Sequence, residues 1–166
     1  MTSETKLIML TQGQAAIVDA SDYEHLSKHK WYAQRTVLGT FYAVRQLARN
    51  NGKQPVARMH RVIIDAPEEM HVDHINHNTL DNRRSNLRLC TNGENKKNSR
   101  SAKGSTSKYL GVGWDRHANK WEALIRVNGK QSRIGRFSCE VEAAKAYDAA
   151  ARKHHGEFAN PNFKED

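Results

Sequence analysis

The stretch from His71 to Arg100, HVDHINHNTLDNRRSNLRLCTNGENKKNSR, holds three histidines, three acidic residues and seven asparagines in thirty positions. A solvated loop needs polar side chains, but it does not need so many imidazoles and amides close together. A histidine with an unperturbed pKa of about 6.5 can accept a proton from water at neutral pH. Carboxylate and amide oxygens are ligands that Mg²⁺ and Mn²⁺ prefer. The residue types therefore fit metal-assisted hydrolysis of a phosphodiester, with an ordinary polar loop as the plainer alternative.

Local signals predict the elements that would position these side chains. Thr91-x-x-Glu94 is a capping box, which predicts a helix that begins at Asn92 and carries Asn95 and Asn98 on one face. Two segments before it, HVDHIN and SNLRLC, are typical of short strands, and HNTLDNRRS forms the loop between them. The expected order is therefore strand, loop, strand, helix.

The segment VDHIN…LDNRRSNLRLCTNGEN closely resembles the HNH endonuclease motif in the form found in phage and intron homing nucleases. Asn86 follows His74 by twelve residues, and Asn95 follows Asn86 by nine. The resemblance implies that His74 is the catalytic general base and that Asn86 ties the loop that positions it. It also implies Asp73 and Asn95 as ligands of one divalent cation, Mg²⁺ or Mn²⁺. Because Asn95 stands where the motif's name has its last histidine, oxygen ligands are favoured over a zinc-type histidine cluster.

Further residues lie within or beside the resemblance, which covers about forty residues, 60–100. His60, in MHRVI, matches a position that the family often carries, and we expect a supporting role for it. Asn98 is a further candidate for the metal or phosphate site. His71 and His77 flank the motif without matching it, so we expect them to be solvated or to contact phosphate. The alternative is that the matching histidine and asparagine merely hydrogen-bond a loop.

Positive charge is concentrated in one part of the chain. The formal net charge of the 166 residues is +9, and segment 96–136 alone holds eleven basic side chains against two acidic ones. This local excess predicts a surface that binds a polyanion, with a merely soluble basic face as the alternative. The apolar fraction of 37% favours small domains over one large core. The two cysteines lack the paired spacing of a disulfide framework or a zinc knuckle.

A regular pattern follows the polar segment 99–108. YLGVGW, KWEALIRV and KQSRIGRF are typical of three strands, and the last two are joined by an Asn128-Gly129 turn. That turn predicts the pairs Val127 with Lys130, Arg126 with Gln131, Leu124 with Arg133, and Ala123 with Ile134. One face of the sheet is then apolar and the other basic. CEVEAAKAYDAAARKHH predicts a helix capped by Ser138, whose alanines let it lie close to the apolar face.

Segment 109–163 resembles the APETALA/ethylene-response-factor DNA-binding domain through YLGV, KWEALIR, IGRF and EAAKAYDAAA, up to the final NF. The resemblance implies a three-stranded antiparallel sheet packed on one helix, with the sheet in the major groove of DNA. By strand position, the expected DNA contacts are Trp114, Arg116, Lys120, Arg126 and Arg133. Trp121 either belongs to the hydrophobic core or contacts DNA. Gly113 departs from the plant pattern, so base preference does not carry over, and a protein-binding sheet is the alternative.

The expected fold class is α+β. A nuclease domain of ββα-metal type, preceded by short strands, would occupy 1–98, a linker 99–108, and the C-terminal sheet and helix 109–163. Within 5–59 we expect a hairpin around Gly13 and a tight turn at Asn51-Gly52.

Together these features predict a metal-dependent endonuclease, of homing type, that acts on double-stranded DNA. One rival is a DNA-binding regulator with an inactive nuclease domain, and another is an RNA-binding or structural phage protein. The N-terminus lacks a secretion signal, and no run of eighteen apolar residues exists. We therefore expect no membrane partner and a cytoplasmic protein, in the host cell if phage-encoded. The oligomeric state is open, with a monomer expected.

Overall fold

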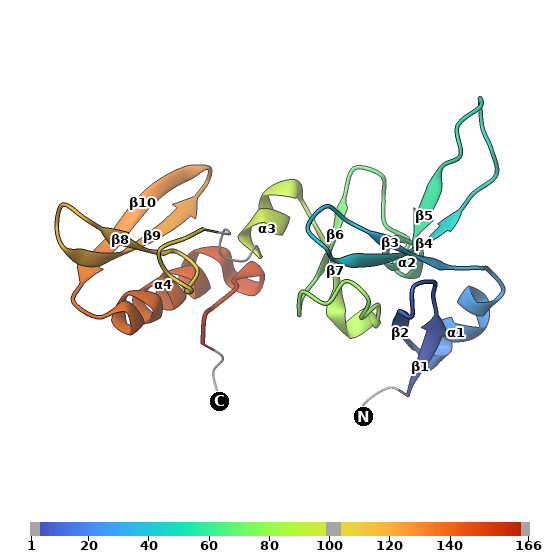
Figure 1. The fold of residues 1–166 in the computed structure, drawn as a ribbon, viewed down its shortest axis with the longest axis horizontal. Coiled ribbons are helices and arrows are strands. Elements are labelled where there is room, and N and C mark those ends of the chain that lie inside the picture. Colours follow the sequence, from blue (N-terminus) through green and yellow to red (C-terminus); the bar gives the residue numbers. More distant parts are fainter. Residues whose placement is uncertain (1–3, 99–103, 164–166) are drawn as a thin grey trace. The chain divides into compact units, whose positions relative to one another are not determined.

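The computed structural model describes residues 4–98 and 104–163 and divides the chain into two compact units, Met1–Asn92 and Gly93–Asp166 (Figure 1). The first contains β1 (Thr5–Met9), β2 (Ala15–Asp19), α1 (Ala20–Ser27), β3 (Tyr32–Arg35), β4 (Phe41–Gln46), β5 (Val56–Arg58), α2 (Met59–Ile63), β6 (His71–His74), the 3-10 helix η1 (Arg84–Asn86) and β7 (Leu87–Cys90). Then follow α3 (Asn92–Lys97), β8 (Val112–Asp115), β9 (Lys120–Val127), β10 (Lys130–Phe137), α4 (Glu140–His155) and η2 (Gly156–Phe158).

The first unit combines three small sheets around one core. β1 pairs with β2, β4 lies between β3 and β5, and β6 pairs with β7, all antiparallel. Val18, Leu26 and Met59 are among the fully buried side chains of the core, which joins β2, α1 and α2. A short parallel bridge between Ile17 and Asp81 attaches the β6–β7 loop to this core. The loop is therefore held by residues far from it in sequence.

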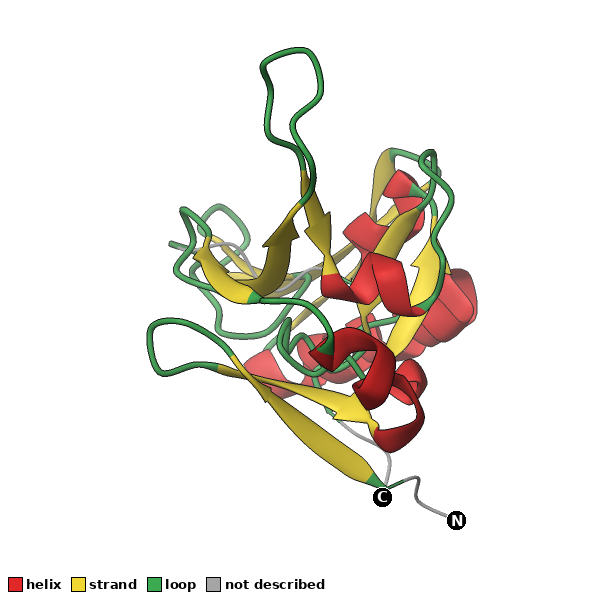
Figure 2. Ribbon diagram, turned by 90° about the vertical axis from the view of Figure 1, so that its right-hand side faces the viewer, coloured by secondary structure: helices red, strands yellow, loops and turns green. Residues whose placement is uncertain are grey.

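The β4–β5 hairpin projects from the first unit (Figures 1 and 2). At its turn Asn51 has φ 48° and Gly52 has φ 76°, and Asn50 and Lys53 exchange two backbone hydrogen bonds. Two successive positive φ angles define the tight turn that Asn-Gly favours. The predicted turn at Asn51-Gly52 is therefore confirmed.

The second unit contains the predicted three-stranded antiparallel sheet, in the order β10-β9-β8, packed on α4. Ala143, Ala144 and Ala151 are fully buried, so the helix approaches the sheet closely. Gly111 makes a similarly close approach: it has φ +73°, and a Cβ there would lie about 2 Å from the Tyr147 ring. The mixed α+β class and this C-terminal architecture are confirmed.

The predicted register is correct along most of the β9–β10 pair but wrong for Ile134. Arg133 pairs with Leu124 as predicted, whereas Gly135 and not Ile134 lies opposite Ala123, because a β-bulge interrupts the pairing. A bulge inserts one extra residue and shifts the alternation of side chains. Ile134 and Phe137 consequently both pack against the helix-side core.

One predicted helix start is wrong and the other is confirmed. Cys139, and not Ser138, is the residue before α4, and it makes no side-chain capping bond. α3 begins at Asn92, as the capping box predicts. None of the helices within the described ranges is both long and apolar enough for a membrane crossing.

Candidate active site and DNA-binding face

The pairing of β6 with β7 brings two predicted site residues into the interior of the first unit. Asp73 lies opposite Arg88 and His74 lies opposite Leu87. Adjacent residues on a strand point to opposite faces. Asp73 and His74 are nevertheless both buried, with 7% and 5% of their surface exposed. Burial on both faces fixes the two side chains instead of leaving them in a mobile loop.

The Asp73 carboxylate forms a buried ion pair with Arg88. The Arg88 Nε and Nη2 atoms donate to the same carboxylate oxygen, Oδ2, at 3.0 and 2.7 Å. The side chains are 9% and 13% exposed, so the pair is shielded from solvent. A buried carboxylate needs such a partner, because an uncompensated buried charge is strongly unfavourable. Sequence reasoning missed Arg88, because its position opposite Asp73 depends on the register between β6 and β7.

His74 is oriented by an asparagine of the β6–β7 loop. Its Nε2 lies 3.4 Å from Asn82 Oδ1, and the Asn82 amide group donates through Nδ2 to the Leu80 carbonyl at 3.1 Å. This second bond assigns the amide orientation, so Oδ1 faces the imidazole as an acceptor. Nε2 is then the protonated nitrogen, and Nδ1 carries the lone pair in the neutral ring.

Burial is the largest effect on the His74 pKa and lowers it from the ordinary value, while the bond to Asn82 and the charges of Asp73 and Asp81 raise it. The net shift is downward, which keeps the imidazole neutral at neutral pH. A neutral imidazole is the form that can accept a proton.

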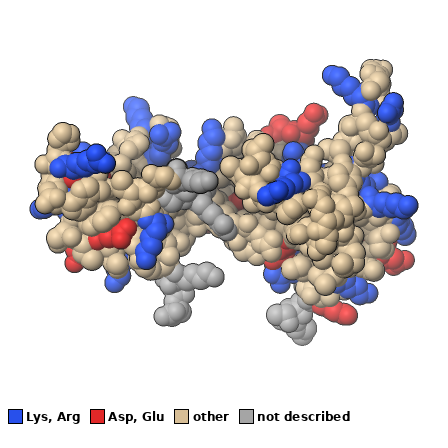
Figure 3. Space-filling view, viewed as in Figure 1, with Lys and Arg blue, Asp and Glu red and all other residues tan. Residues whose placement is uncertain are grey.

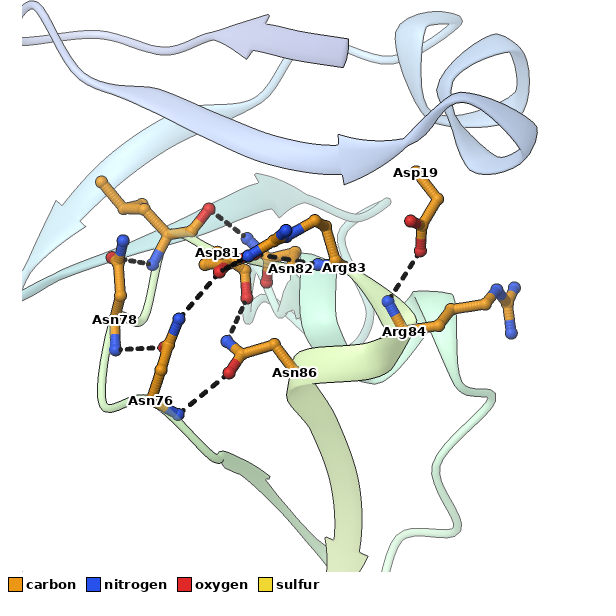
Figure 4. A network of polar contacts seen from close by, with 9 residues as sticks. Asp19, Asn76, Asn78, Asp81, Asn82, Arg83, Arg84 and Asn86 are labelled. Carbon is orange, nitrogen blue, oxygen red and sulfur yellow. Dashed lines mark hydrogen bonds and ion pairs between the residues drawn. The ribbon is translucent and has the colours of Figure 1, made fainter. Parts of the chain in front are cut away.

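Asn86 ties the two ends of the β6–β7 loop together (Figure 4). Its Oδ1 accepts from the Asn76 backbone N–H at 2.9 Å, and its Nδ2 donates to the Asp81 carbonyl at 2.7 Å. The Ile75 N–H in turn donates to the Asn86 carbonyl at 2.9 Å. Because Asn86 is 5% exposed, water does not compete strongly with these bonds. The loop that follows His74 is therefore closed by one amide side chain.

Asp81 organises the middle of the same loop (Figure 4). Its carboxylate accepts from Arg83 Nε and Nη2 at 2.7 and 2.6 Å, and from Asn76 Nδ2 at 2.8 Å. The Arg83 bond is the main cause that lowers the pKa of Asp81. Farther along, the Arg84 N–H donates to Asp19 Oδ2 at 2.8 Å, which links the loop to the end of β2.

His60 packs against His74 from α2. The two ring centroids are 5.0 Å apart in an edge-on arrangement, and the Tyr42 ring touches both at 5.4 and 6.1 Å. Burial, followed by the charge of His74, lowers the pKa of His60 to about 3. Its Nδ1 is buried and has no hydrogen-bond partner among the described residues. His60 is therefore a buried, neutral ring that packs against the predicted base.

Asn95 and Asn98 belong to the second unit. Asn95 lies on α3 and is half-buried, and Asn98 follows the helix and is buried. Their pairing with Asp73 stays a prediction. Within the described residues, no group of three or more His, Cys, Asp or Glu side chains is arranged to hold a metal ion. A carboxylate with amide oxygens is a different donor set, of the hard kind that Mg²⁺ accepts.

The outer face of the second unit's sheet carries most of the predicted DNA-contacting side chains. Lys120 and Arg126 are exposed on β9, and Arg116 is exposed after β8. Arg133 is half-exposed and pairs with Glu122 at 3.1 Å. The pair restrains Arg133, whereas Arg126 is exposed on the same face.

Trp114 lies on the other side of the sheet. It pairs directly with Trp121, with ring centroids 5.0 Å apart, and Trp121 packs against the helix-side core. Directly opposed residues share a face, so Trp114 is turned toward the side of α4 and away from Arg126. Alternation along β8 could have revealed this, because Val112 is a core residue two positions earlier.

The loop HNTLDNRRS contains residues that support the predicted site but that the sequence analysis did not single out. Asn82 holds His74, and the Asp81–Arg83 pair with Asn76 holds the loop. The density of Asn and Asp was the available signal, because short amides commonly satisfy backbone groups in turns.

These features define a chain with a histidine-centred strand–loop–strand site in one unit and a helix-backed antiparallel sheet with a basic outer face in the other. The family model of HNH endonucleases matches residues 58–97. A protein of Acanthamoeba polyphaga mimivirus, named as an uncharacterized HNH endonuclease, is 33% identical over 154 residues, which cover 91% of this chain and 76% of the relative. The chain belongs to the HNH endonuclease family.

Two other relatives match parts of the chain. Protein 3.8 of Escherichia phage T7 is 31% identical over 93 residues, 56% of this chain and 76% of its own length. The AP2-like ethylene-responsive transcription factor TOE2 of Arabidopsis thaliana is 41% identical over 68 residues, which are 41% of this chain and 14% of the plant protein. The chain therefore joins an HNH region to an AP2/ERF-like region, and both predicted resemblances are confirmed.

Proposed function

We propose that the protein is a metal-dependent endonuclease that hydrolyses phosphodiester bonds in double-stranded DNA. The observation that carries the proposal is the buried His74, kept neutral by burial and held through Nε2 by Asn82, directly beside the Asp73 carboxylate. Both residues lie within the segment that the HNH family model matches.

His74 acts as the general base and accepts a proton from the attacking water at Nδ1. The hydrogen bond from Nε2 to Asn82 keeps this tautomer and stabilises the imidazolium that forms. Asn86 holds the loop closed, and through the loop it fixes Asn82 relative to the base. Asn82 and Asn86 are in this proposal positioning residues that do not touch the phosphate.

The metal ligands that we propose are the Asp73 carboxylate and the Asn95 amide oxygen, with Asn98 as a neighbour. Hard oxygen donors fit Mg²⁺ or Mn²⁺, and the buried position of Asp73 suits a fixed ligand. When bound, a divalent cation neutralises charge on the phosphorane and the leaving oxygen. Arg88 shares the Asp73 carboxylate, so it holds the ligand in place and competes with the cation.

The AP2/ERF-like unit supplies DNA binding in this proposal. Arg126 and Lys120 are exposed on the outer sheet face, where arginine can bind guanine or phosphate. A tethered binding unit raises the effective concentration of DNA at a nuclease region that binds DNA weakly on its own. A chain that combines DNA cleavage with a separate DNA-binding unit suits a homing endonuclease, which we propose as the biological role.

The direct test uses supercoiled plasmid with and without Mg²⁺ or Mn²⁺. The wild type should nick or cut the plasmid only with the metal, and His74→Ala should abolish the reaction. His71→Ala is the matched control, because His71 is exposed on the same strand. Tight plasmid binding without cleavage under every metal condition would instead favour a DNA-binding regulator with an inactive nuclease. Preference for RNA over duplex DNA would favour the RNA-binding alternative.

A further inference from the structure

A pocket in the first unit lies outside the predicted active site. It has a volume of about 420 Å³ and is lined by His29, Lys30, Tyr32, Arg45 and Gln46. The lining comes from the segment after α1 and from β3 and β4. Two of the five side chains are permanent cations and none is acidic. Its chemistry is therefore that of a site for an anion.

Arg45 is held in place at this pocket. Its guanidinium lies over the Trp31 ring, 5.7 Å from the ring centroid. Trp31 is itself fixed, since it is 6% exposed and its Nε1 donates to the Leu26 carbonyl at 2.9 Å. A guanidinium stacked on a buried aromatic ring loses little further freedom when it binds a ligand.

The Arg45 Nε atom is buried and lacks a hydrogen-bond partner among the described residues. A buried donor without an acceptor is unfavourable, and most such groups in folded proteins find a partner. An oxygen anion entering the pocket would supply the acceptor. Phosphate matches this donor well, because its oxygens accept from the guanidinium fork and from an ammonium together.

The charges around His29 also indicate a positive electrostatic potential at this pocket. Burial is the largest effect that lowers the pKa of His29, followed by the charges of Arg45, His25 and Lys28. The nearby cations thus act in one direction, which favours a negatively charged ligand.

We propose that this pocket, the Arg45 pocket, binds a DNA backbone phosphate other than the one that is cleaved. The assignment rests on the proposed function, which makes duplex DNA the substrate. Tyr42, which touches His74, and Gln46, which lines the pocket, lie four residues apart on β4 and therefore on the same face of the strand. Four residues of strand span roughly 13 Å, a distance that one DNA strand can cover. Basic side chains also lie on the projecting β4–β5 hairpin (Figure 3).

Duplex binding by the full chain in EDTA tests the proposal without involving catalysis. The dissociation constant of a short duplex is measured by fluorescence anisotropy over a range of salt concentrations. Arg45→Gln should weaken binding several-fold and flatten the salt dependence by about 0.9 in log–log slope, the value for one lost phosphate contact. Lys30→Gln should change binding and slope in the same direction. Because Lys30 is exposed, this variant tests the site even if Arg45→Gln impairs folding.

Lys6→Gln is the matched control. It removes the same charge from β1, where Lys6 lies over the Tyr23 ring, and it should leave the slope unchanged. Wild-type slopes in both Arg45→Gln and Lys30→Gln would overturn the proposal. If plasmid cleavage fails in the wild type while the Arg45→Gln slope still changes, the proposed function fails and the phosphate site stands.

A second measurement distinguishes the source of the phosphate. The Nε–H resonance of Arg45 is followed by NMR during titration with the duplex and, separately, with inorganic phosphate. A shift with the duplex supports the proposal. A shift with inorganic phosphate alone overturns the assignment to DNA and leaves a site for a small phosphate compound. No shift with either probe overturns the site itself.

Discussion

The two units hold their functional side chains in opposite ways. In the first, Asp73, His74 and Asn86 are buried and bonded to named partners before any substrate arrives. In the second, Lys120 and Arg126 are exposed on the face of a small sheet. Catalysis requires groups that are fixed relative to one another, whereas binding to a polyanion tolerates mobile cations in water. The difference predicts that substitutions of these buried residues affect rate and stability, and that substitutions of the exposed sheet cations affect affinity.

Among the positioning residues, the largest effect should come from Asn86→Ala. The substitution leaves the Asn76 N–H and the Asp81 carbonyl without their buried partner, which costs about 2 kcal/mol of stability. Because the loop also positions His74, the nicking rate should fall on the order of 100-fold. Plasmid nicking and urea unfolding measure the two effects. Asn78→Ala, at an exposed loop position, is the control and should change both far less; equal losses in the two variants would contradict the role of Asn86.

Stability of the first unit should fall in acid because of His60. Its pKa is about 3 in the folded protein, against an ordinary value of 6.5, so the unfolded chain binds the proton first as the pH falls. The free energy of unfolding is therefore undiminished above pH 6.5 and declines between 6.5 and 3, by at most about 1.4 kcal/mol per pH unit. Urea unfolding at several pH values measures this slope.

His60→Phe should make that slope shallower, since a buried phenyl ring takes up no proton. His71→Gln, at an exposed position, should leave the slope as it is. If the wild type and His60→Phe lost stability in parallel, burial of a neutral His60 would not be the cause.

On the second unit, Arg126→Ala combined with Arg133→Ala should weaken duplex binding about tenfold and flatten its salt dependence. Low-salt nicking should stay largely intact. The structure sharpens this expectation: Arg133 is held by Glu122, so the single variant Arg126→Ala should account for most of the loss. Salt-dependent anisotropy measures both. Unchanged affinity in the double variant would refute the assignment of the sheet face.

The effect of Arg88→Gln on nicking should be smaller, while the loss of the partner of the buried Asp73 carboxylate also lowers stability. Without the guanidinium on Asp73, the proposed cation no longer competes for the carboxylate. The Mg²⁺ concentration that gives half-maximal nicking should therefore fall a few-fold, which a metal titration of the nicking rate measures. Arg84→Gln, at an ion pair with Asp22, is the control. A rise in the required Mg²⁺ would show that Arg88 assists the metal site and does not oppose it.

Local signals explain what could be predicted from the sequence. The capping box places the start of α3 at Asn92, and Asn-Gly fixes the turn of the β4–β5 hairpin, because both depend on a few adjacent residues. The spacing of His74 and Asn86 is also a local signal, because both residues flank one short loop. It therefore identifies the motif from the sequence alone.

What the sequence did not reveal depends on contacts between distant segments. Arg84 bonds to Asp19, which is 65 residues away, and the loop joins Ile17 through a parallel bridge. The bulge before Gly135 is another case: it turns Phe137 as well as Ile134 toward α4, and strict alternation cannot anticipate it. Packing of the helix on the sheet, and not the strand's own pattern, selects that register.

The most direct test compares one quantity in two variants: the rate of metal-dependent plasmid nicking at saturating protein and low salt. With a lost general base, His74→Ala should be slower by at least about 100-fold while binding the duplex normally. The Arg126→Ala and Arg133→Ala double variant should cleave near the wild-type rate once its weaker binding is saturated. Wild-type cleavage by His74→Ala, or an equal loss of rate in both variants, would contradict the assignment of catalysis to the buried His74 site and of DNA binding to the exposed sheet face.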